Sequence, residues 1–224
     1  MRLEGLPRAT SEKTTRRSRR KKIRALLQSY ACPVPFHEIR TRFLGNIATP
    51  EMSASPMSVV KNLWGGELPE FKSLDAVNEL IGALVNGLWN SLTRHQKRSD
   101  PFRLVRPTVV PTRDGLAQFA LMRQQEIDGF FDGLFAGAEK ADLPAKASVS
   151  LDSLGQLRAM MAGVYEVAID ESKPATPSDI ATTIKHLREL TLAMELEINR
   201  VVLDCTRARR QMMGAISNAG PTRH

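Results

Sequence analysis

The chain has 224 residues, of which 42% are hydrophobic but only 5% aromatic, so aliphatic and methionine side chains must build most of its core. The net charge is +8 at pH 7, and Cys32 and Cys205 are the two cysteines. No apolar run has the length of a membrane helix, no apolar region follows the basic N-terminus as in a secretory signal, and neither cysteine belongs to a zinc or redox motif. We expect a cytoplasmic protein without a cofactor.

The N-terminal segment carries the excess positive charge. Residues 1–24 hold ten Lys and Arg against two Glu, whereas the other residues hold equal numbers of basic and acidic side chains. This indicates a basic flexible arm over 1–24, with residues 1–15 disordered. Positive charge at a helix N-terminus opposes the helix dipole, so a helix here should begin late, near Arg19, or form only when an anion is bound.

The basic arm predicts contact with the phosphates of DNA or RNA. No aromatic residues are interleaved, so base stacking is not offered and the contact would not depend on sequence. A solvated tail, or an import or membrane-surface signal, is the alternative. The side chains that would carry the electrostatics are Arg16, Arg17, Arg19, Arg20, Lys21, Lys22 and Arg24.

Three helices are predicted in the next part of the chain. The first begins at Phe36 and ends with Gly45 as its C-cap. The second runs from about 55 to 64, because Ser55 suits the cap position and Pro56 the first helical position, and Gly65-Gly66 stops it. The third follows the cap Ser73, and its apolar residues recur at three- and four-residue steps: Leu74, Val77, Ile81, Leu84, Val85, Leu88 and Leu92.

A proline-rich connector, 98–115, then leads to two longer helices. The predicted helix over 115–138 has three glycines spaced four residues apart, Gly129, Gly133 and Gly137, which indicates close packing against a neighbouring helix. The next helix begins at Ser150 or Asp152. Four large aromatic residues between positions 64 and 119 are interpreted as core residues rather than as the lining of a groove for a partner: Trp64, Trp89, Phe102 and Phe119.

After a linker at 171–178, residues 179–213 contain no proline and a single heptad-patterned apolar stripe. The stripe predicts a long helix, followed by a tail at 214–224. It would pack back onto the domain, self-associate or pair with a partner helix. The residues expected to mediate helix pairing are Ile184, Leu187, Met194, Ile198 and Val201.

The stretches RFLGNIATPEMSASPMSVVKNLWGGELPEF, LWNSL, PFRL and EIDGFFDGLFAGAE resemble the YecA/YgfB-like group of bacterial helical proteins over roughly 36–168. The resemblance implies an all-helical domain and no single enzyme class. Some members carry a C-terminal Cys-rich metal-binding tail. This chain lacks those cysteines, so the resemblance implies no metal site here.

Other chemistry has little support in the sequence. Asp128 and Asp132 share a helix face, which fits a solvated surface better than oxygen ligation of a metal. The histidines form no recognised catalytic pattern, and no phosphate-binding glycine loop occurs. An enzyme assembled from dispersed residues would leave no such motif.

We therefore expect an all-α fold, with a helical domain over 25–170 between the basic arm and the long C-terminal helix. The expected function is that of a non-enzymatic bacterial interaction or regulatory protein whose arm contacts nucleic acid or another polyanion. The alternative is a protein-only adaptor that binds its partners through the helical domain and the C-terminal helix, with no membrane association.

Overall fold

The computed structural model describes residues 8–51, 55–135 and 142–218. This part of the chain is helical, without a strand, and so confirms the all-α class. The helices in chain order are α1 (Arg8–Ser29), α2 (Phe36–Ala48), α3 (Pro56–Asn62), α4 (Leu74–Ile81), the π-helix η1 (Gly82–Trp89), α5 (Asn90–Leu92), the 3-10 helix η2 (Thr93–Gln96), α6 (Arg113–Phe135), α7 (Ala145–Ile169) and α8 (Pro177–Asn218).

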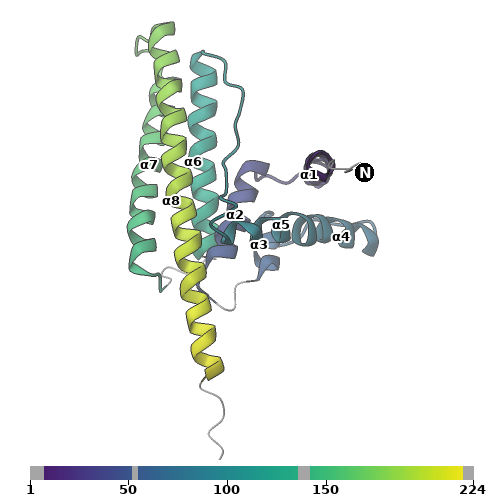
Figure 1. The fold of residues 1–224 in the computed structure, drawn as a ribbon. Coiled ribbons are helices and arrows are strands. Elements are labelled where there is room, and N and C mark those ends of the chain that lie inside the picture. The colour runs from purple at the N-terminus through teal and green to yellow at the C-terminus, as the bar shows by residue number, and fades with distance from the viewer. Residues whose placement is uncertain (1–7, 52–54, 136–141, 219–224) are drawn as a thin grey trace, which may run out of the picture.

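Two layers of helices meet at α2 (Figure 1). On one side α6, α7 and α8 lie side by side as a three-helix bundle. On the other side the run from α4 to α5 extends away from the bundle, and α1 lies across it, seen end-on in Figure 1. Within the described ranges, every helix is too short or too polar for a bilayer crossing.

The crossing of α2 and α6 depends on glycines. A Cβ atom on Gly133 would lie 1.8 Å from the Arg42 carbonyl oxygen, and one on Gly129 would lie 2.6 Å from the Glu38 carbonyl oxygen. The two backbones are therefore in direct contact, which confirms the close packing predicted for these two glycines; Gly137 lies outside the described residues. The contact lets apolar side chains of both helices interlock in the core: Ile39, Phe43, Leu44, Ile127, Phe130 and Leu134.

The prediction that Gly45 ends its helix is wrong. Helix α2 continues to Ala48, and the Thr49 N–H donates to the Gly45 carbonyl. Gly45 is instead part of the crossing, because a Cβ atom there would lie 2.1 Å from the Phe130 carbonyl oxygen. Helix α7 also differs from its prediction, since it begins at Ala145 and places Ser150 inside the helix rather than at its start.

The predicted helix after Ser73 is a continuous helical run, but its middle turns are π-helical. The Ser73 hydroxyl accepts from the Ala76 N–H at 3.2 Å, which confirms the predicted cap. The predicted cap Ser55 likewise accepts from the Met57 N–H at 3.1 Å. The buried positions of the run differ in part from those predicted: they are Leu80, Leu84, Leu88 and Leu92, whereas Leu74 is exposed.

Helix α8 is unbroken from Pro177 to Asn218 and so extends beyond the predicted 179–213 at both ends. It packs against α7, α6 and α2, and its lower end continues past the other helices in Figure 1. The apolar stripe is buried in this packing. The long helix is therefore part of the same core as the domain that precedes it.

Helix α1 begins at Arg8 rather than near Arg19. Its C-terminal half is fixed by Ile23 and Leu27, which are buried. Because the helix begins at Arg8, the basic run that starts at residue 16 lies in the middle of the helix and not at its positive end. The predicted domain boundary at residue 24 falls within this helix. Residues 1–7 lie outside the described residues, and the flexibility of the arm stays a prediction.

Candidate polyanion-binding groove

An extended segment, 101–106, positions one wall of the groove. Its backbone is bound by polar side chains of α6 and α8. The Phe102 N–H donates to Asn199 Oδ1 at 2.7 Å, and Asn199 Nδ2 donates to the Phe102 carbonyl at 3.1 Å. Since Phe102 and Leu104 are also buried, the segment is held both by its backbone and by every second side chain.

Glu195 of α8 fixes two arginines of this segment. Its carboxylate is buried and accepts from the Leu104 N–H at 2.7 Å. The same carboxylate pairs with Arg103 at 2.9 Å and with Arg106 at 2.8 Å. One buried acidic group therefore holds two cations at the surface and neutralises only part of their charge.

A buried ion pair supports the segment from α6. Arg123 pairs with Glu126 and donates to the Val105 carbonyl, while its Nε donates to Thr191 Oγ1 at 3.0 Å. Glu126 in turn accepts from the Val105 N–H at 3.1 Å. Burial raises the pKa of the Glu126 carboxyl, and the adjacent Arg123 guanidinium opposes this shift. The two charges therefore neutralise each other inside the protein and are not exposed to a ligand.

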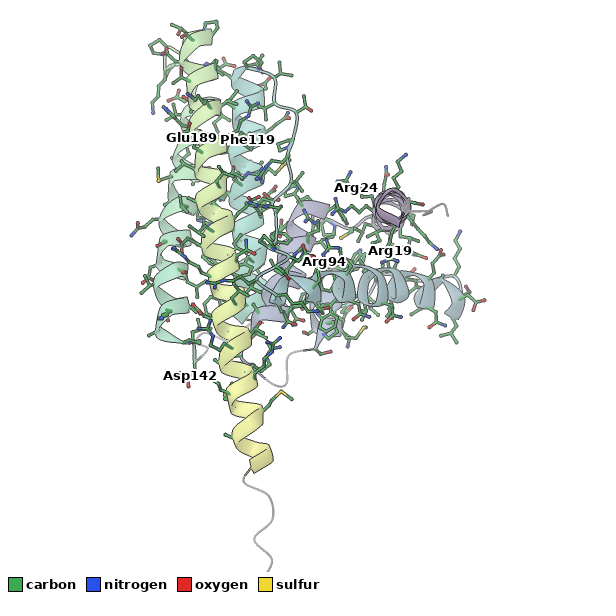
Figure 2. The ribbon with its side chains drawn as sticks, viewed as in Figure 1. Arg19, Arg24, Arg94, Phe119, Asp142 and Glu189 are labelled. Carbon is green, nitrogen blue, oxygen red and sulfur yellow. The ribbon has the colours of Figure 1, made fainter. Side chains whose placement is uncertain are left out.

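The groove itself lies between α1, α2, η2 and the extended segment. One hollow of about 450 Å³ adjoins another of about 320 Å³, and the two share Arg20, Arg40, Arg94 and His95. Figure 2 shows Arg19 and Arg24 on α1, across from Arg94. We call this surface the arginine groove and define it by Arg19, Arg20, Arg24, Arg40, Arg94, Arg103 and Arg106.

Arg40 lies at the bottom of the arginine groove and is 7% exposed. Its Nη2 donates to the Arg103 carbonyl at 3.1 Å, and its guanidinium stacks 4.8 Å from the centre of the Phe102 ring. Desolvation, together with the nearby charges of Arg20, Arg24 and Arg94, lowers the pKa of Arg40 to about 10. The protein therefore holds a desolvated cation among like charges, an arrangement that a bound anion would stabilise.

The carboxylates around the arginine groove neutralise some of its arginines. Arg94 pairs with Asp100 at 3.1 Å, and Glu195 pairs with both Arg103 and Arg106. The three arginines of α1 form no ion pair with a described side chain; Arg24 lies 4.8 Å from the centre of the Phe36 ring. The arginine groove is therefore cationic, and its guanidinium groups come from elements on opposite walls.

The structure separates the seven predicted polyanion-binding residues. Arg19, Arg20 and Arg24 line the arginine groove. Lys22 lies apart from it and pairs with Glu79 at 2.9 Å, and Lys21 is exposed outside the lining of the groove. Residues 16 and 17 belong to α1, but their side chains lie outside the described part of the structure.

Four arginines of the groove were not predicted from the sequence: Arg40, Arg94, Arg103 and Arg106. They come from three separate segments, and none lies in a basic run. A weak signal is present in FRLVRP, where two arginines flank an apolar pair in a proline-rich connector. Only the tertiary arrangement brings these residues next to α1.

The predicted partner-helix residues lie in the core of the same chain. Side chains of α7, α6 and α2 cover them, which corresponds to the alternative in which the long helix packs back onto the domain. A partner helix would have to displace these neighbours. The exposed fractions are 4% for Ile184, 1% for Leu187 and 0% for Met194, Ile198 and Val201.

The remaining candidate groups have structural partners. Asp128 pairs with Arg158, and Asp132 pairs with Arg42 at 2.7 Å. In the ranges that the structure describes, no three His, Cys, Asp or Glu side chains gather as metal ligands would. Burial raises the pKa of the Cys205 thiol to about 11, so this cysteine is a core residue rather than a nucleophile.

Comparison with known proteins identified no relative of this chain. No family model, curated protein or solved structure matches the chain. The resemblance to the YecA/YgfB-like group therefore stays a prediction, and the inference of function depends on the groove itself.

Proposed function

We propose that this protein is a non-enzymatic interaction or regulatory protein that binds nucleic acid, with phosphate groups held in the arginine groove. The observation that carries the proposal is the convergence of seven arginines from four segments on two adjoining hollows. Guanidinium groups bind phosphate through paired N–H donors and keep their charge at every physiological pH. A groove of this kind is suited to a phosphodiester backbone.

Preorganisation supports a binding role. Glu195 and the backbone contacts of the extended segment hold Arg103 and Arg106 in place before any ligand arrives. Arg40 is fixed by its hydrogen bond to the Arg103 carbonyl. Because these arginines are already ordered, less side-chain entropy would be lost on binding.

The character of the groove favours recognition without base preference. Phe36 lines the hollow, but the Arg24 guanidinium already lies over one face of its ring, so little aromatic surface is offered for stacking. The protein would bind phosphates, which position a nucleic acid but carry no sequence information. We expect similar affinities for strands of different sequence.

The test is fluorescence anisotropy of the full chain with labelled DNA and RNA at several salt concentrations. Arg20→Gln combined with Arg24→Gln should weaken binding about tenfold or more at low salt and reduce the magnitude of the salt slope by about 1 for each phosphate that is no longer neutralised. Lys21→Gln combined with Lys185→Gln removes the same charge from exposed sites outside the groove and is the matched control. Equal losses in both variants, or no binding by the wild type, would contradict the proposal.

The protein-only adaptor remains the second candidate, and one observation favours it. A hollow of about 610 Å³ between α6, α7 and α8 is lined by Met160, Val164 and Val167, and half of the Met160 side chain is exposed. An apolar segment of a partner could bind there. Pull-down by the wild type but not by Met160→Glu, without binding of nucleic acid, would support this function instead.

A further inference from the structure

A second basic groove lies between α8, the start of α7 and the residues that follow η2. Its volume is about 900 Å³, and residues from all three segments line it. We call it the α8 groove and define it by its six cations: Lys97, Arg98, Lys146, Arg200, Arg207 and Arg210. None of these residues belongs to the basic N-terminal segment.

Few carboxylates balance these charges. Arg207 pairs with Asp204 at 3.4 Å and Arg200 with Glu197 at 2.6 Å; both arginine side chains are more than half exposed and, unlike Glu195, neither carboxylate is fully buried, so these pairs are weak. The other four cations of the α8 groove form no ion pair with a described side chain. A phosphate could therefore bind here without first breaking a strong ion pair.

Two buried hydroxyl residues lie beneath this groove. Thr206 lines it and is buried, and its hydroxyl has no hydrogen-bond partner among the described residues. Ser150, also buried, lies one turn after Lys146; Lys146 itself is in the first turn of α7, where a helix dipole favours negative charge. Hydroxyl groups and ammonium or guanidinium groups together are a typical environment for phosphate oxygens.

The two grooves share the segment 93–100 as a common wall. Arg94 lines the arginine groove and Lys97 lines the α8 groove. The two residues are three positions apart, so their Cα atoms are separated by no more than about 10 Å. On α8, Asn199 binds the extended segment while its neighbour Arg200 lines the second groove.

From this arrangement we propose that one single strand of nucleic acid runs from the arginine groove over the 93–100 turn into the α8 groove. The inference rests on the proposed function and specifies its ligand. A free phosphate or a mononucleotide would occupy one groove only. A duplex has a persistence length of about 150 base pairs and is too stiff to bend over the short 93–100 turn, whereas a single strand can follow the surface.

The test compares strand lengths in the full chain. Labelled single strands of about 5 and about 20 nucleotides, both of mixed sequence, are titrated at several salt concentrations, with a duplex of the longer sequence alongside. Lys146→Gln combined with Arg210→Gln removes two exposed cations that lie only in the α8 groove. Lys185→Gln combined with Arg188→Gln, both exposed on another part of α8, is the matched control.

We expect the Lys146/Arg210 variant to bind the long strand about tenfold more weakly than the wild type, with a salt slope reduced in magnitude by about 1.4 because two phosphates are no longer neutralised. Its affinity for the short strand should stay within about twofold of the wild type, because the arginine groove holds that strand alone. The duplex should bind more weakly than the single strand of equal length. Circular dichroism checks the fold, and Lys97→Gln combined with Arg98→Gln gives a second variant of the same groove.

Three results would overturn this inference. An unchanged affinity for the long strand would place the α8 groove off the path, equal losses for both lengths would make it an independent site, and tighter binding of the duplex would exclude a single strand. If the Arg20/Arg24 variant still loses affinity in these cases, the proposed function survives. Absence of binding by the wild type at low salt would overturn both.

Discussion

The α2–α6 crossing and the arginine groove both use helix α2, but different interactions stabilise them. At the crossing, Gly45, Gly129 and Gly133 bring two backbones into contact, and apolar side chains fill the space around them. At the groove, Arg40 of the same helix is surrounded by other cations. The packing at the crossing stabilises the fold, whereas the repulsion between like charges at the arginine groove opposes it. A protein that gains stability when a charged surface is neutralised is expected to use that surface for binding.

The largest effect should come from the crossing. Gly133→Ala places a methyl group on the Arg42 backbone, so α2 and α6 must move apart, and we expect a loss of about 3 kcal/mol in the free energy of unfolding. Urea denaturation followed by circular dichroism measures it. Gly155→Ala in α7 is the control, because nothing lies within 4 Å of a Cβ atom there. It should raise stability by about 0.5–1 kcal/mol through helix propensity; a comparable loss in both variants would contradict the packing argument.

Removal of the carboxylate behind the groove should have the next largest effect. Glu195→Ala leaves the buried Leu104 N–H without an acceptor and releases Arg103 and Arg106, which should cost about 2–3 kcal/mol. Glu197→Ala removes an acidic group two positions away that pairs only with an exposed arginine, and should change stability by less than about 0.5 kcal/mol. Thermal unfolding of both variants decides whether the extended segment depends on Glu195.

Arg20→Gln combined with Arg24→Gln should change stability in the opposite direction. Both substitutions remove charge that faces Arg40, so we expect stability to rise by about 0.5 kcal/mol at low salt and the difference to shrink as salt screens the repulsion. Differential scanning fluorimetry at several salt concentrations measures it. A destabilised variant would show that these arginines support the fold, and the contrast between the two regions would then be wrong.

The smallest effect should appear at mildly acidic pH. Burial lowers the pKa of His95 below its ordinary value of 6.5, and its Nδ1 lies 2.7 Å from the Asp100 carbonyl oxygen. Because the unfolded chain takes up the proton first, stability should fall as pH drops below about 6.5. Burial raises the pKa of Glu126, which acts in the opposite sense at lower pH, so the comparison has to be made with His95→Asn. The variant should lose less stability than the wild type between about pH 7 and pH 5.5.

Local features of the fold could be predicted where local chemistry decides the structure. Ser55 and Ser73 cap their helices because a hydroxyl satisfies a free N–H at the first turn, wherever the helix later packs. Gly65 and Gly66 have φ angles of 81° and 109°, as expected of glycines after a helix stop. The heptad stripe of α8 gave the right buried face, although a periodic pattern does not say which neighbour covers it.

Features that depend on tertiary contacts could not be predicted in the same way. Gly45 has the local signature of a helix end, and only the approach of the Phe130 backbone explains a glycine inside α2. The connector shows the same limit: it contains two apolar pairs, Leu104–Val105 and Val109–Val110, yet Leu104 is buried together with Phe102, whereas Val110 is 60% exposed. The arginine groove is the clearest case, since α2, η2 and the connector each supply single arginines that have no common sequence signal.

The hold on the extended segment has an evolutionary consequence. Asn199, Glu195, Glu126 and Arg123 all bind main-chain groups of 102–105, and those groups are the same in every amino acid except the N–H that proline lacks. The exposed side chains at 103 and 106 can therefore be exchanged one at a time while the segment keeps its path, because the other arginine still pairs with the buried Glu195 carboxylate. A descendant of this protein could acquire a groove of different charge, and so a different ligand, through a few codon changes in one short stretch.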